Sequence, residues 1–349
     1  MDRAIYRIID ANFNRGREGL RVAEEFCRFA LDNELLAGQC KELRHRLSAA
    51  VAKLDMQRLI TARDTENDVG CGMEVAGQMK RKSFEDCVTA GFARTTEALR
   101  AIAEATAVID GALSSQFEKL RYDSYILEKE ICLQGYPALK FKKTKLYCVI
   151  TAQNNLDVLK IAKDCAKGGA DCLQLRAKNI SDVELLPLAR KFVDLCKHEN
   201  VISIINDRPD IAVAADADGV HLGQGDLPAD EVRKIQLKPL IIGISTHSMV
   251  ELTGAIKQKP HYVGIGSVFS TNTKQVEVCG LEYVSEAMEF LKDKFVDAVA
   301  IGGITTKNVE KVLQAGAKKI AVSGCVCLAK NPADVCKELK EIIIKYFPN

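Results

Sequence analysis

The stretch Lys145–Lys178, KLYCVITAQNNLDVLKIAKDCAKGGADCLQLRAK, decides the fold. It begins with the apolar run Leu146–Thr151, continues with helical apolar spacing, and ends with a second apolar run near Cys172–Leu175. The Gly169-Ala170 pair before the second run fits a tight turn between a helix and a strand. Because both runs are continuously apolar rather than alternating, they predict neighbouring parallel strands that are buried on both faces.

The same rhythm recurs eight times along the chain. The expected strands lie near Leu146–Thr151, Cys172–Leu175, Ile202–Asn206, Gly219–Leu222, Ile241–Ser245, Tyr262–Gly266, Ala298–Gly302 and Ile320–Ser323. The expected helices lie near Asp157–Lys167, Val183–Lys197, Asp210–Ala215, Ala229–Gln236, Ser248–Gln258, Val284–Leu291, Lys307–Ala315 and Ala333–Tyr346. Eight repeats predict an α/β fold, a (β/α)8 TIM barrel over residues 145–349.

The first part of the chain has a different character. Residues 1–135 contain almost no strand-like run and show helical spacing of apolar residues, so they predict a mainly helical domain. Residues 136–144, which follow Gly135 and contain Pro137 and several lysines, are expected to link this domain to the barrel.

The helical part contains a repeat. Asn12–Arg21 aligns with Gly91–Arg100, and the alignment matches two arginines, a glutamate and a leucine at one offset. Helices that carry such a repeat could pair as two halves of a bundle. A third polar string, Ala62–Thr65, is expected in a loop between helices.

Composition excludes several classes of protein. A net charge of +2 provides no global basic field for nucleic acid, and no apolar run approaches a membrane span. The charged N-terminus does not resemble a signal peptide. Thirteen cysteines without a C-x-x-C pair predict reduced, buried thiols and a cytoplasmic location, and their spacing disfavours a zinc site. The sequence leaves the oligomeric state open, a homo-oligomer included.

Candidate site residues lie at or just after the ends of most of the expected strands, where the active sites of such barrels lie. They are Gln174, Arg176, Lys178, Asn206, Asp207, Asp226, Ser245, Thr271, Thr273, Lys274, Gly303, Val322 and Ser323. Mg²⁺ prefers oxygen ligands, usually one or two carboxylates with phosphate oxygens, and Asp207 and Asp226 fit that role. Arg176 and Lys178 are two apart on an extended segment, so both can face one diphosphate.

A second anion site is expected after the last two strands. Gly302-Gly303 and Val322-Ser323 lie where loops of this fold commonly bind phosphate through backbone N–H groups. Two anion sites suggest two small phosphorylated substrates.

Each residue alone also has a plain structural interpretation. Arg176 or Asp207 could form a salt bridge at the rim, and Asp226 could cap a helix. His221 and His247 are interpreted as structural rather than catalytic. The convergence of charged residues from many strands favours a binding site.

At these residues the chain resembles the thiamine-phosphate synthase family, over about Lys145–Asn349. The strings that carry the resemblance are QLRAK, NDR, HLGQGD, GIS, GIGSVFSTNTK, AIGGI and AVSG. Ser270 and Gly324 depart from the usual family residues, proline and alanine. The resemblance implies that hydroxymethylpyrimidine diphosphate is joined to hydroxyethylthiazole phosphate, which gives thiamine phosphate and pyrophosphate.

The resemblance also implies a role for each site residue. Gln174 and Ser245 would hold the pyrimidine, and the diphosphate would be held by Arg176, Lys178, Asn206 and Lys274. Asp207 and Asp226 would bind Mg²⁺. The thiazole phosphate would be held by Thr271, Thr273, Gly303, Val322 and Ser323.

The implied mechanism is ionisation: pyrophosphate leaves, and the thiazole nitrogen captures a pyrimidine-stabilised cation, so no protein base is required. Two alternatives stay open for the barrel. A thiazole tautomerase shares the fold but lacks the diphosphate-binding set, and a binding or regulatory barrel would perform no turnover.

The helical part resembles a small family that is often fused to these synthases. The strings are DANFNRGREGLRVAEEFCRF, ARDT with DVG, and EALR with LRYDSYILEK. This resemblance implies a hydroxymethylpyrimidine-phosphate kinase with ATP as the donor. The candidate residues are Arg15, Glu18, Arg21, Arg63, Asp64, Arg94, Glu97 and Arg100.

From the residues alone the kinase is less supported. No P-loop of the G-x-x-x-x-G-K-[ST] type is present, although the arginines could clamp phosphates and Asp10, Asp64 or Asp68 could hold Mg²⁺. The alternative is a non-catalytic dimerisation bundle whose charged residues form surface ion pairs.

Overall fold

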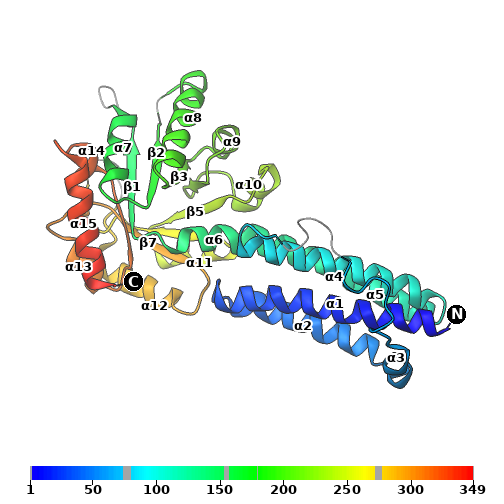
Figure 1. The fold of residues 1–349 in the computed structure, drawn as a ribbon. Helices are drawn as coiled ribbons and strands as arrows, with labels where there is room; N and C mark the ends of the chain where they lie inside the picture. Colours follow the sequence, from blue (N-terminus) through cyan, green and yellow to red (C-terminus); the bar gives the residue numbers. More distant parts are fainter. Residues whose placement is uncertain (1, 74–79, 153–156, 179, 272–276, 349) are drawn as a thin grey trace. The chain divides into compact units, whose positions relative to one another are not determined.

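The computed structural model describes residues 2–73, 80–152, 157–178, 180–271 and 277–348. The chain divides into two compact units, Met1–Tyr136 and Pro137–Asn349. Each unit has its own architecture (Figure 1).

The first unit is built of helices that lie side by side. They are α1 (Asp2–Phe29), α2 (Glu34–Val51), α3 (Met56–Ala62), α4 (Phe84–Ala107), α5 (Gly111–Glu130) and the π-helix η1 (Ile131–Gly135). Side-chain caps fix several of their starts. Asn33, Ser83 and Asp110 accept hydrogen bonds from N–H groups in the first turns of α2, α4 and α5.

The two repeat segments pair directly, as expected. Helices α1 and α4 run antiparallel and cross where Gly19 meets Gly91. A Cβ on Gly19 would lie 2.3 Å from the Gly91 carbonyl oxygen, so only glycine permits this approach. Thr95 Oγ1 donates to the carbonyl oxygens of Gly91, at 2.9 Å, and Gly16, at 3.3 Å. The small residues of the repeat therefore form the helix–helix contact.

The segment expected as a linker is mostly helical. Helix α6 spans Tyr136–Lys142 and follows η1 directly along the chain. Pro137 in its first turn has no N–H to donate, and the N–H of Tyr136 before it donates to the Ile131 carbonyl oxygen in the π-helical pattern. Phe141 on this helix is fully buried inside the second unit, so the segment contributes to the core of that unit.

The second unit is a closed barrel of parallel strands in sequence order, which confirms the predicted fold. The strands are β1 (Leu146–Thr151), β2 (Cys172–Arg176), β3 (Ile202–Asn206), β4 (Gly219–Leu222), β5 (Ile241–Thr246), β6 (Tyr262–Ile265), β7 (Asp297–Ile301) and β8 (Lys319–Val322). Every expected strand is present, with ends within about one residue of the prediction.

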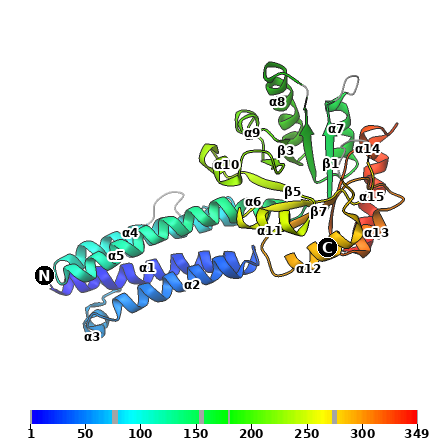
Figure 2. The same ribbon diagram turned by 180° about the vertical axis from the view of Figure 1, so that it is seen from behind.

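Helices cover the outside of the barrel (Figure 2). They are α7 (Val158–Lys167), α8 (Asp182–His198), α9 (Pro209–Ala214), α10 (Ala229–Ile235), α11 (Met249–Lys257), α12 (Gly280–Leu291), α13 (Val309–Gln314), α14 (Gly324–Cys327) and α15 (Pro332–Tyr346). All eight expected helices are present, and the short α14 after β8 is an addition that the sequence pattern did not predict.

Alternation along the strands divides the barrel core into two layers. Leu146, Cys148 and Ile150 of β1 pack outward against the helices. Tyr147 and Val149 of the same strand belong to a second cluster, which fills the barrel interior. The inward residues at the carboxyl ends of the strands are therefore placed to line a site.

All thirteen cysteines are free, but the prediction that they are buried holds only in part, because Cys71 is exposed and Cys87, Cys132, Cys279 and Cys325 are half-buried. Three that are distant along the chain, Cys148, Cys165 and Cys336, meet in the outer core layer with their sulfur atoms within 4.8 Å of one another. In the part of the chain that the structure describes, no helix has the length and apolar character needed to span a membrane.

Candidate active site

A cavity of about 740 Å³ opens at the carboxyl ends of the barrel strands. Eleven of the thirteen site residues named from the barrel sequence line it: Gln174, Arg176, Lys178, Asn206, Asp207, Asp226, Ser245, Thr271, Gly303, Val322 and Ser323. The remaining two, Thr273 and Lys274, lie outside the described residues. The structure thus gathers every described member of the predicted set into one place.

Strand β2 supplies three of the lining residues at alternate positions. Gln174, Arg176 and the following Lys178 face the same side because side chains alternate along an extended segment. Arg176 is half-buried, and its side chain has no hydrogen bond or ion pair with any described residue. The rim salt bridge considered for Arg176 is therefore absent from the described structure, and its guanidinium is available to an anionic ligand.

Two carboxylates and one ammonium group lie together on the next part of the rim. Lys178 Nζ lies 3.4 Å from Asp207 Oδ2. Asp207 follows β3 with a positive φ of 61°, held by its backbone N–H, which donates to the His221 carbonyl oxygen at 2.8 Å. Burial, together with the neighbouring Asp207 carboxylate, raises the pKa of Asp226, and Lys178 partly offsets this shift.

Asp226 does not cap the following helix. Its Oδ2 atom accepts a hydrogen bond from the Gly223 backbone N–H at 2.6 Å, and the N-cap of α10 is Pro228. The local bond fixes the Asp226 carboxylate beside Asp207 at the cavity.

The donor set fits a hard divalent cation. Two adjacent carboxylates repel each other unless a proton or a cation lies between them, and this repulsion adds to the burial that raises the pKa of Asp226. Carboxylate oxygens beside a cavity that admits phosphate oxygens and water match the preference of Mg²⁺. Asp207 and Asp226 could therefore hold such an ion.

The opposite side of the cavity is built from backbone. Gly302 and Gly303 adopt positive φ values of 110° and 61°. A Cβ on Gly303 would lie 2.5 Å from the Ser270 carbonyl oxygen, so the loop after β7 packs closely against the loop after β6. After β8, Ser323 Oγ donates to the Val149 carbonyl oxygen at 2.8 Å. These loops are the segments for which the sequence predicts a second anion site.

Two tyrosines that the sequence pattern did not indicate also line the cavity. Tyr147 and Tyr262 lie within apolar strands, and their hydroxyl groups are 2.9 Å apart. His221 also lines it, with Nδ1 3.0 Å from Tyr262 Oη and Nε2 2.8 Å from Ser245 Oγ. These residues lie on three different strands, so the spacing of residues within any one strand could not predict that they meet.

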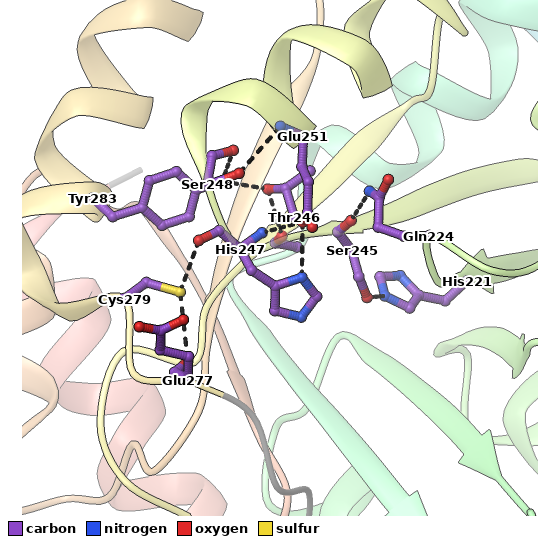
Figure 3. A network of polar contacts seen from close by, with 11 residues as sticks. His221, Gln224, Ser245, Thr246, His247, Ser248, Glu251, Glu277, Cys279 and Tyr283 are labelled. Carbon is purple, nitrogen blue, oxygen red and sulfur yellow. Dashed lines mark hydrogen bonds and ion pairs between the residues drawn. The ribbon is translucent and has the colours of Figure 1, made fainter.

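A second polar network surrounds the end of β5 (Figure 3). His247 Nδ1 lies 2.9 Å from Glu251 Oε2, and the same oxygen accepts from the His247 backbone N–H. Tyr283 donates to Thr246 Oγ1 at 2.7 Å. His247 and Glu251 line the cavity, although His247 had been interpreted as structural.

The candidate residues of the helical unit do not form one cluster. Arg63 makes a two-point contact with the buried Asp10 carboxylate, at 2.8 and 2.7 Å, which raises the pKa of Arg63. Asp64 next to it contacts Arg3 at 3.5 Å, and its carbonyl oxygen accepts from Arg7 at 3.1 Å. Arg63 and Asp64 are thus held against the first half of α1.

The other candidates divide into paired and unpaired groups. Arg21 pairs with Glu24 and Glu25 at helical spacing, and Arg100 pairs with Glu104 and Glu118, as the bundle interpretation predicted. The exposed residues without a hydrogen bond or ion pair in the described part of the chain are Arg15, Glu18, Arg94 and Glu97.

Fold and site together define a TIM-barrel enzyme whose cavity is suited to phosphorylated ligands. A family model described as thiamine monophosphate synthase matches residues 146–326. The thiamine-phosphate synthase of Thermosynechococcus vestitus is 38% identical over 336 residues, which cover 95% of this chain and 93% of the relative. The chain belongs to the thiamine-phosphate synthase family.

Further comparisons agree with this assignment. The thiamine-phosphate synthase of a Synechocystis species is 38% identical over 337 residues, 96% of this chain and 95% of the relative. A solved structure of thiamine phosphate pyrophosphorylase from Pyrococcus furiosus is 34% identical, with a TM-score of 0.54, and covers 60% of this chain and 99% of that one. A model described as the ThiD2 family matches residues 7–130, in the helical unit.

Proposed function

We propose that the barrel joins hydroxymethylpyrimidine diphosphate to hydroxyethylthiazole phosphate and releases thiamine phosphate and pyrophosphate. The observation that carries this proposal is the gathering of cationic and anionic side chains from successive strands around one cavity. The family membership and the nearly full-length similarity to synthases support the same reaction.

The two sides of the cavity suggest how the substrates divide. Arg176, Lys178 and Asn206 lie on the side of β2 and β3, where cationic and amide groups suit the diphosphate. Gly303 and Ser323 follow β7 and β8, where backbone N–H groups suit the single phosphate of the thiazole. The pyrimidine would lie between Gln174 and Ser245.

Mg²⁺ would be held by Asp207 and Asp226. When bound, it would neutralise charge on the diphosphate oxygens, which is the chemistry that such an ion supplies in phosphoryl sites. A bound cation would also offset the repulsion from Asp207, which together with burial raises the pKa of Asp226.

The residues of the chain would act by electrostatics rather than by proton transfer. The bond between the pyrimidine methylene carbon and the diphosphate oxygen breaks, and its electron pair leaves with the oxygen. Arg176 and Lys178 would stabilise the negative charge that develops there. The thiazole nitrogen then donates its lone pair to the methylene carbon, a step for which no protein base is needed.

A tautomerase barrel is disfavoured because three residues of the predicted diphosphate-binding set, Arg176, Lys178 and Asn206, line the cavity. The direct test incubates the full chain with both substrates and Mg²⁺ and quantifies both products. Equal amounts of thiamine phosphate and pyrophosphate, lost when either substrate or Mg²⁺ is omitted, would support the proposal. No product from the folded protein would refute it.

For the helical unit we propose phosphorylation of hydroxymethylpyrimidine phosphate by ATP, which would make the diphosphate that the barrel consumes. The match to the ThiD2 family and the unpaired Arg15 and Arg94 beside the α1–α4 crossing support this role. Those exposed guanidinium groups are free to bind phosphate oxygens.

The kinase proposal can be tested in the full chain by blocking the barrel with Lys178→Ala, so that any diphosphate accumulates. This variant should convert the monophosphate and ATP to diphosphate and ADP. Adding Arg94→Ala should slow the conversion, whereas Arg190→Ala, an exposed barrel residue on α8, should not. If the folded Lys178→Ala protein forms no diphosphate, the kinase proposal is refuted, and the alternative of a non-catalytic bundle is favoured.

We also propose a cytoplasmic location, which the thirteen free cysteines support because thiols remain reduced there.

A further inference from the structure

A chain of hydrogen bonds crosses the inside of the barrel and connects five strands. Gln174 Nε2 donates to Tyr147 Oη at 2.6 Å, and Tyr147 Oη lies 2.9 Å from Tyr262 Oη. Tyr262 Oη lies 3.0 Å from His221 Nδ1, and His221 Nε2 lies 2.8 Å from Ser245 Oγ. The two ends of this polar chain are the residues that face the proposed pyrimidine.

The surrounding residues hold the middle of the polar chain rigidly. The Phe141 ring stacks on Tyr262 with centroids 4.2 Å apart and an interplanar angle of 12°. Tyr262 also crosses directly over Gly243, where a Cβ would lie only 2.1 Å from the tyrosine ring. Tyr147 and Tyr262 are both almost completely buried, so their hydroxyl groups depend on protein partners.

The chemistry of the groups determines the direction of each hydrogen bond. An amide nitrogen can only donate, so Tyr147 Oη accepts from Gln174. Tyr147 then donates its own hydrogen to the Tyr262 oxygen, which is a stronger acceptor than the Cys172 sulfur that also lies near it. A buried hydroxyl hydrogen without an acceptor is strongly disfavoured.

The same reasoning continues to the other end. Tyr262 accepts from Tyr147 and therefore donates to His221 Nδ1. A neutral imidazole that accepts at Nδ1 carries its hydrogen at Nε2, so His221 donates to Ser245 Oγ. The Gln224 amide donates to the Ser245 carbonyl oxygen at 2.6 Å and holds that backbone in place (Figure 3).

This order defines the hydrogen-bonding groups at the two ends. Ser245 Oγ is already an acceptor, so its hydrogen is free to be donated into the cavity. Gln174 uses one of the two hydrogens on its Nε2 atom for Tyr147, which fixes the orientation of the amide and leaves its Oε1 atom free to accept. Neither free group has a partner among the described residues, and both side chains line the cavity.

We propose that Tyr147, Tyr262 and His221 are positioning residues that make the cavity select an aminopyrimidine over the corresponding oxopyrimidine. This inference rests on the proposed synthase reaction. A 4-aminopyrimidine edge presents an amino donor beside a ring-nitrogen acceptor, which matches one acceptor and one donor on the protein. A 4-oxopyrimidine presents a carbonyl acceptor beside a ring N–H, which is the reversed pattern.

The test compares kcat/KM for the 4-amino substrate and its 4-oxo counterpart, each with hydroxyethylthiazole phosphate. The wild type should prefer the amino compound by roughly a thousandfold, as expected when buried polar groups are left mismatched. Tyr262→Phe and Tyr147→Phe keep their rings but remove the hydroxyl groups that fix the order. Each should reduce the preference by roughly tenfold or more.

Tyr283→Phe is the matched control, because it removes a hydroxyl that bonds to Thr246 outside the polar chain. It should retain the wild-type preference. An unchanged preference in both Tyr262→Phe and Tyr147→Phe would overturn the inference. If a folded variant turns over neither compound, the ratio of their dissociation constants from calorimetry replaces the kinetic ratio, with the same expected loss. A wild type that uses neither compound would refute the proposed reaction instead.

Discussion

Lys178 Nζ lies 3.4 Å from Asp207 Oδ2, and this pair connects the cationic and acidic parts of the cavity rim. The Lys178 side chain is half-exposed, at 50%, so the ion pair adds little to folding. Its position beside the proposed diphosphate gives it a larger role in catalysis.

We therefore expect Lys178→Ala to lower kcat roughly a hundredfold while it changes the free energy of unfolding by less than about 0.5 kcal/mol. Steady-state kinetics and urea denaturation would measure the two effects. Lys191→Ala, on the exposed face of α8, is the control and should change neither. Turnover at the wild-type rate in Lys178→Ala would contradict the assignment.

Asp226→Asn tests how the Asp226 carboxylate affects folding stability in the absence of Mg²⁺. The raised pKa of Asp226 means that losing its proton, as the pH rises through that pKa, costs folding free energy. Without Mg²⁺ at pH 7, Asp226→Asn should therefore be at least as stable as the wild type, and the difference should shrink as the pH falls below the pKa.

With Mg²⁺ present, the wild type should be more stable than Asp226→Asn. Saturation at about 100 times the dissociation constant stabilises a protein by about 2.7 kcal/mol, a gain that should be smaller in Asp226→Asn. Thermal melts with and without Mg²⁺ would measure it. An equal rise in melting temperature with Mg²⁺ in both proteins would mean that Asp226 does not bind the ion.

Gly303→Ala tests the second anion site. The new Cβ would lie 2.5 Å from the Ser270 carbonyl oxygen at a positive φ, so the loop after β7 must move. We expect the free energy of unfolding to fall by about 1–3 kcal/mol. We also expect the KM for the thiazole phosphate to rise more than the KM for the pyrimidine diphosphate. A larger change for the diphosphate would argue against the division of the cavity.

Two glycines of the helical unit provide a matched pair for packing. Gly19→Ala would place a Cβ 2.3 Å from the Gly91 carbonyl oxygen, and we expect it to destabilise the unit by about 1–3 kcal/mol or more. Gly38 on α2 has nothing within 4 Å of a built Cβ, so Gly38→Ala should stabilise by about 0.5–1 kcal/mol. Equal melting temperatures would contradict the α1–α4 contact.

The barrel could be predicted from the sequence because its signal is local. Each strand is a continuous apolar run, and charged residues such as Arg176 and Asp207 follow the runs directly. In a parallel barrel the carboxyl ends of all strands lie at one rim, so residues that follow different strands are brought together there.

The remaining features depend on tertiary contacts that no local pattern reveals. Tyr147 and Tyr262 have the same spacing as core residues, and only closure of the barrel brings their hydroxyl groups together. The helical segment around Phe141 was expected as a linker because it follows Gly135 and contains Pro137 and three lysines. Burial of Phe141 against Tyr262 stabilises that helix.

The most direct test of the account measures pyrophosphate release in a single turnover with both substrates and Mg²⁺. The wild type should release one pyrophosphate for each thiamine phosphate formed. Arg176→Ala should slow release by roughly a hundredfold, because its side chain lines the cavity where the diphosphate is proposed to bind, and Arg190→Ala should not. Release at the wild-type rate from Arg176→Ala would contradict the claim that this cavity catalyses departure of the diphosphate.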